Sequence, residues 1–117
     1  MSINCIRTLI EDANVSNPDK IALVFGNEKL TYRELFTKVN QIAYYLAELD
    51  LPKGSRIGLY SNKGIDQVIA ILAILSTNYV LVPLTKLLKA EQVEYIIGDC
   101  DIKCIITDKI KLESIEE

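Results

Sequence analysis

The distribution of apolar residues along the chain predicts alternating strands and helices. Arg56–Tyr60 is a short apolar run that follows turn-forming residues 52–55, which is typical of a buried strand. Residues 68–75 carry no polar side chain, which predicts a helix buried on more than one side. Residues 79–82 are a second apolar run, and Pro83 is expected to end it. We therefore expect a right-handed βαβ unit with two parallel strands.

The remaining segments extend this pattern in both directions. Residues 3–13 carry apolar side chains at helical spacing, which predicts an amphipathic helix. Ile21–Phe25 and residues 29–30 flank a Gly-Asn-Glu turn, which predicts a hairpin. Residues 89–99 have a helical pattern and residues 103–107 read as a strand, so a second βαβ unit is expected. A further helix could begin after residue 107.

A capping box marks the start of the longest predicted helix. In Thr31-Tyr-Arg-Glu34, the Thr31 hydroxyl can accept from the Glu34 N–H while the Glu34 carboxylate accepts from the Thr31 N–H. Apolar residues then recur at spacings of three and four as far as Leu49. The apolar face of this helix is expected to pack on the core.

Together these elements predict an α/β fold with a mostly parallel sheet built from βαβ units, flanking helices and an N-terminal hairpin. A length of 117 residues suits one domain, residues 1–117. The net charge of −3 argues against nucleic acid as a partner. Polar residues and a proline interrupt the apolar stretch 65–84, so no membrane span is expected. The first residues lack the pattern of a secretory signal, which favours a cytoplasmic protein.

The cysteines predict reduced thiols and no metal site. Cys5, Cys100 and Cys104 are odd in number, and the chain has no histidine. A metal cluster built from Cys100, Cys104 and the neighbouring Asp99 and Asp101 is a remote alternative, because the spacing matches no zinc motif.

One loop is a candidate anion site. Ser61, Asn62, Lys63 and Gly64 lie between the carboxyl end of a predicted strand and the start of a predicted helix, where ligands of α/β sheets gather. The simpler interpretation is that Ser61 or Asn62 only caps the helix, because the loop lacks the glycine density of a phosphate cradle. No catalytic nucleophile can be assigned, since no serine or cysteine has a recognisable base partner.

Several segments resemble the adenylate-forming superfamily, which includes acyl-CoA synthetases, aryl-acid ligases and the adenylation domains of nonribosomal peptide synthetases. Leu-Thr-Tyr-Arg-Glu-Leu at 30–35 resembles the first core motif of that family. Residues 71–75 with 79–84 resemble the second. The resemblance runs almost without gaps from residue 3 to residue 108, with further matching segments at 18–25, 51–57 and 87–93.

Two departures from the family pattern concern loops. Ser76-Thr77-Asn78 stands where the family usually has Lys-Ala-Gly, and Thr85-Lys86 stands where it usually has Asp or Asn and then Pro. These departures are expected to change the local loop geometry and to leave the fold intact.

The motifs that the family uses to bind ATP and catalyse its reaction do not occur in this sequence. They are a Ser/Thr/Gly-rich loop ending in Pro-Lys, an aromatic-Gly-x-Thr-Glu stretch, a hinge aspartate and a late lysine. The five glycines of this chain are scattered, at 26, 54, 58, 64 and 98. The resemblance therefore implies the N-terminal fragment of an ATP-dependent acid–thiol ligase. ATP, Mg, CoA and a carboxylic acid would be used only by the complete enzyme, and this chain would have no cofactor and no catalytic residue.

Two other interpretations stay open. Residues 87–93 favour an acyl-CoA synthetase, whereas residues 30–46 fit the amino-acid adenylation domain of a peptide synthetase equally well. The chain could also be a non-catalytic α/β interaction module that oligomerises or pairs with the remainder of a ligase.

Overall fold

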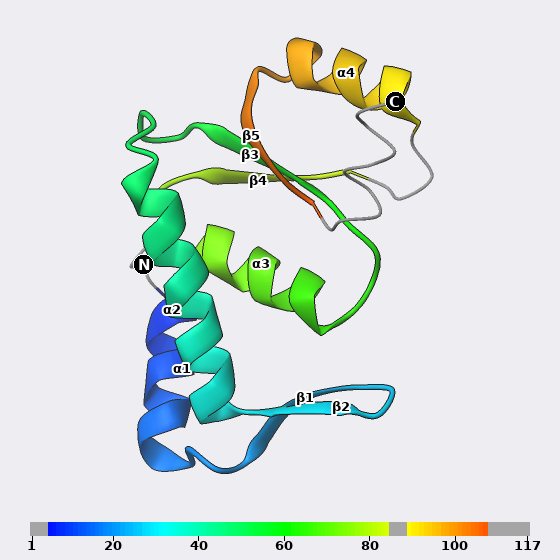
Figure 1. The fold of residues 1–117 in the computed structure, drawn as a ribbon. Helices are drawn as coiled ribbons and strands as arrows, with labels where there is room; N and C mark the ends of the chain where they lie inside the picture. Colours follow the sequence, from blue (N-terminus) through cyan, green and yellow to red (C-terminus); the bar gives the residue numbers. More distant parts are fainter. Residues whose placement is uncertain (1–4, 85–88, 108–117) are drawn as a thin grey trace.

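A three-stranded parallel sheet with helices on both faces forms one part of the molecule, and a hairpin extends from the other (Figure 1). This computed structural model describes residues 5–84 and 89–107, so a helix after residue 107 and the departure at 85–86 lie outside the described residues. In chain order the elements are α1 Cys5–Ser16, β1 Ile21–Phe25, β2 Glu28–Thr31, α2 Tyr32–Glu48, β3 Arg56–Tyr60, α3 Ile65–Leu75, β4 Val80–Pro83, α4 Ala90–Asp99 and β5 Ile102–Thr107.

Strand β3 lies at the centre of the sheet, whose order is β4-β3-β5. Ile57 in β3 is in register with Leu81 in β4 and with Cys104 in β5, and both pairings are parallel. The connection from β3 to β4 and the connection from β4 to β5 run in opposite directions across the sheet. Right-handed crossovers then place α3 and α4 on opposite faces, as Figure 1 shows. The predicted parallel sheet built from βαβ units is confirmed.

The structure shifts several predicted boundaries by a few residues. Helix α3 begins at Ile65, three residues before the uninterrupted apolar run. Helix α1 ends at Ser16, immediately before Asn17-Pro18, residues that favour the end of a helix. Strand β4 includes Pro83, whereas the sequence suggested that proline ends the strand. Proline is tolerated there because β4 is an edge strand, and the next residue, Leu84, donates its N–H to the Leu59 carbonyl at 2.9 Å.

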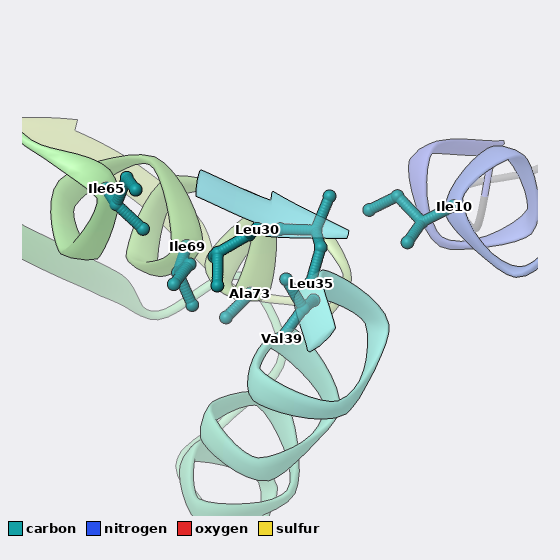
Figure 2. Close-up of a cluster of buried hydrophobic side chains, with 7 residues drawn as sticks. All are labelled: Ile10, Leu30, Leu35, Val39, Ile65, Ile69 and Ala73. Carbon is teal, nitrogen blue, oxygen red and sulfur yellow. The ribbon is translucent and has the colours of Figure 1, made fainter. Parts of the chain in front are cut away.

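Three clusters of buried side chains hold these elements together. The first joins α1, β2, α2 and α3, and Figure 2 shows its members: Ile10, Leu30, Leu35, Val39, Ile65, Ile69 and Ala73. The second lies between the sheet and α4, and consists of Tyr60, Leu84, Val93 and Ile102. The third contains Leu46, Ile57 and Ile74. Because Ala73 and Ile74 of α3 belong to different clusters, α3 is buried on more than one side, as predicted.

Helix α3 is also too short to cross a membrane, since it has 11 residues and a span needs about 20. Across the described ranges, no helix combines the length and the apolar character that a membrane span requires.

The predicted capping box at the start of α2 is confirmed. The Thr31 N–H donates to Glu34 Oε1 at 3.0 Å, and the Glu34 N–H donates to Thr31 Oγ1 at 3.2 Å. Two hydrogen bonds with Thr31 lower the pKa of Glu34, and the bond with the Thr31 backbone has a larger effect than the bond with its side chain. The carboxylate is thereby favoured in its charged form, which also complements the positive end of the helix dipole.

We expect Thr31→Ala to lower the free energy of unfolding by about 1 kcal/mol, because it removes the hydroxyl that satisfies the Glu34 N–H. Urea unfolding followed by circular dichroism measures this change. The matched control is Thr37→Ala, which removes the same atoms from an exposed position inside α2 and should change stability by less than about 0.5 kcal/mol. Equal losses in the two variants would contradict the capping role.

Candidate functional site

The candidate loop joins the carboxyl end of β3 to the first turn of α3. Tyr60, which precedes the loop, has no exposed surface, so the end of β3 is fixed in the core. The N-cap position of α3 belongs to Gly64, whose backbone is extended and which makes no side-chain capping bond. Neither Ser61 nor Asn62 is therefore the N-cap residue, and the simple capping interpretation is wrong.

The four loop residues line a cavity of about 320 Å³. The cavity lies between the turn of the β1–β2 hairpin, the first turns of α3 and the carboxyl ends of β3 and β5. Its lining residues are Phe25, Glu28, Leu59, Ser61, Asn62, Lys63, Gly64, Ile65, Asp66, Gln67, Ala70, Ile106 and Thr107. The structure thus brings the predicted loop together with the end of a neighbouring strand, as expected for an α/β sheet.

The charges of this lining do not favour a polyanion. Lys63 is the cation of the lining, and it is opposed by the carboxylates of Glu28 and Asp66. Asp66 lies in the first turn of α3, where its own charge already complements the helix dipole. A triphosphate would meet a net charge of about −1 from these three side chains. The weak anion site at Ser61, Asn62, Lys63 and Gly64 stays a prediction, limited to a small anion.

Ser61 carries an unusual polar atom. Its Oγ is buried and has no hydrogen-bond partner among the described residues. A serine hydroxyl can donate one hydrogen bond and accept two, and leaving such a group unsatisfied costs about 1–3 kcal/mol. The Ser61 hydroxyl is therefore a buried polar group that the described residues leave unsatisfied.

A larger groove of about 1060 Å³ lies near the amino ends of β3 and β4, between α2 and the turn that joins α3 to β4. Several of its polar groups are already used within the fold. The Leu51 N–H donates to the Tyr79 hydroxyl at 3.2 Å, Ser76 Oγ donates to the Leu72 carbonyl at 2.8 Å, and Thr77 Oγ1 donates to the Ile74 carbonyl at 2.6 Å. The residues that depart from the family's Lys-Ala-Gly thus close the turn through side-chain hydrogen bonds.

Two of the three cysteines of the chain pack against different clusters. Cys100 packs against the cluster under α4, and Cys104 packs against the cluster that contains Ile57. Both are free thiols, and burial raises the pKa of Cys104, which makes its thiolate scarcer. Within residues 5–84 and 89–107, no group of three or more His, Cys, Asp or Glu side chains has the geometry of a metal site.

The contribution of the hairpin to the cavity was not predicted. Phe25 and Glu28 flank the hairpin turn, more than 30 residues before the loop that they face. The sequence indicated the turn through its glycine and asparagine. It contained no local signal for where the turn would lie in the tertiary structure.

The described residues form an α/β unit, and comparison with known proteins identifies the family to which it belongs. The model of the AMP-binding enzyme family matches residues 10–117. The chain belongs to this family, and the resemblance to the adenylate-forming superfamily is confirmed.

Relatives of both predicted kinds are found. Tyrocidine synthase 1 of Brevibacillus parabrevis is 36% identical over 104 residues, which cover 89% of this chain and 10% of that protein. A medium/long-chain-fatty-acid–CoA/3-oxocholest-4-en-26-oate–CoA ligase of Mycobacterium marinum is 31% identical over 104 residues, covering 89% of this chain and 19% of that protein. The chain thus spans a fifth or less of these relatives.

The fold is shared with solved members of the same class. The anthranilate CoA ligase AuaEII, solved in complex with anthranoyl-AMP, matches 99% of this chain and 24% of its own length. The TM-score is 0.84 at 24% sequence identity, which establishes the shared fold. The predicted fold class, part of an adenylate-forming enzyme, is therefore confirmed.

Proposed function

We propose that residues 1–117 form the N-terminal, scaffold-building portion of an ATP-dependent acid–thiol ligase of the acyl-CoA synthetase kind. The complete enzyme would convert a carboxylic acid to an acyl-adenylate and then to a thioester, using ATP, Mg and CoA. The observation that carries this proposal is the family match over residues 10–117, combined with a coverage of 19% of the Mycobacterium marinum ligase. The free thiols of Cys100 and Cys104 support a cytoplasmic location.

The described residues do not fit a nucleotide triphosphate. The loop at 61–64 contains one glycine, and the cavity that it lines carries two carboxylates against one lysine. The motif residues also have a structural role. Leu30 and Leu35, which begin and end the first core motif, are 8% and 4% exposed and pack in the core. These two motif residues therefore stabilise the scaffold.

The expected result is that residues 1–117 catalyse no ATP–pyrophosphate exchange with fatty, aryl or amino acids. The reason is that the chain supplies buried scaffold and no backbone cradle for phosphates. The assay is the exchange of radiolabelled pyrophosphate into ATP, with AuaEII and anthranilate as a positive control in the same buffer. Exchange above the enzyme-free blank, lost on heat denaturation of the chain, would overturn the proposal.

An amino-acid adenylation domain of a peptide synthetase is the second candidate, favoured by the 36% identity to tyrocidine synthase 1. The two candidate functions differ in the thiol that accepts the acyl group. If the chain belongs to an acyl-CoA synthetase, a polypeptide that contains this chain and the rest of the ligase should transfer its acyl group to free CoA. If it belongs to an amino-acid adenylation domain, that polypeptide should load a carrier domain and leave free CoA unmodified.

A further inference from the structure

No further inference is drawn: the strongest candidate, the exposed apolar edge of β1 in the two-stranded hairpin, carries none because nothing in the structure shows what covers it.

Discussion

Replacing Ala73 by aspartate is expected to lower the free energy of unfolding by about 3–5 kcal/mol. Ala73 lies on α3 and has no exposed surface. Its cluster consists of aliphatic side chains from α1, β2, α2 and α3 (Figure 2), so an introduced carboxylate would be charged and without a partner. Stabilities of small domains are about 5–15 kcal/mol. The variant should therefore be close to unfolding, as measured by its urea midpoint.

Leu75→Asp is the matched control, two residues further along α3. Leu75 is 38% exposed, so its carboxylate can be hydrated, and the loss should be smaller, about 1–2 kcal/mol, from lost apolar contact and from a negative charge at the C-terminal end of α3. The two variants should also differ in their response to pH. Burial raises the pKa of a carboxyl group in the folded state above its unfolded value, so the Ala73→Asp variant should regain stability relative to the control as the pH falls. Similar midpoints for both variants would contradict the burial of this face of α3.

Local features of the fold could be predicted because their signals lie within a few residues. The capping box needs only Thr31 and Glu34, which are three residues apart. The hairpin turn depends on Gly26, whose φ of 60° suits glycine at the first turn position. The apolar run in α3 indicated burial on two sides, and the two clusters that meet there confirm it.

The position of β5 could not be predicted, because it depends on contacts between distant residues. Strand β3 has two edges, and either could accept a parallel strand. The structure pairs β5 with β3, through a register irregularity between Arg56 and Ile57. The Arg56 guanidinium also donates to the Cys100 carbonyl at 2.6 Å, which ties the end of α4 to β3. Neither contact joins neighbours in the sequence, so no periodic pattern reveals it.

The candidate site was also predictable only in part. The loop at 61–64 could be located from strand and helix signals alone. The two carboxylates that oppose Lys63 could not be predicted as part of the site, because Glu28 comes from the hairpin and Asp66 reads as an ordinary first-turn residue. Because the cavity combines charges from separate elements, the carboxylates that argue against a polyanion are revealed only by the tertiary structure.

The second large effect is expected at the centre of the sheet, where Ile57→Ala should lower the free energy of unfolding by about 2–5 kcal/mol. Ile57 has no exposed surface and packs in the cluster with Leu46 and Ile74, against α2 and α3. It also lies between Leu81 of β4 and Cys104 of β5 in the sheet register. Truncation leaves a cavity between strands and helices that are held from both sides, so the surroundings can collapse only partly.

A graded series separates this packing effect from a general intolerance of the sheet. Ile57→Val removes one methylene group and should cost about 0.5–1.5 kcal/mol. Val80 lies on the edge strand β4 and is 47% exposed, so Val80→Ala should lower the free energy of unfolding by less than about 1 kcal/mol. Urea unfolding should therefore rank the variants Ile57→Ala, Ile57→Val and Val80→Ala in order of decreasing loss. A loss at Val80 as large as that at Ile57 would contradict the central position of β3, on which both βαβ units and the location of the candidate loop depend.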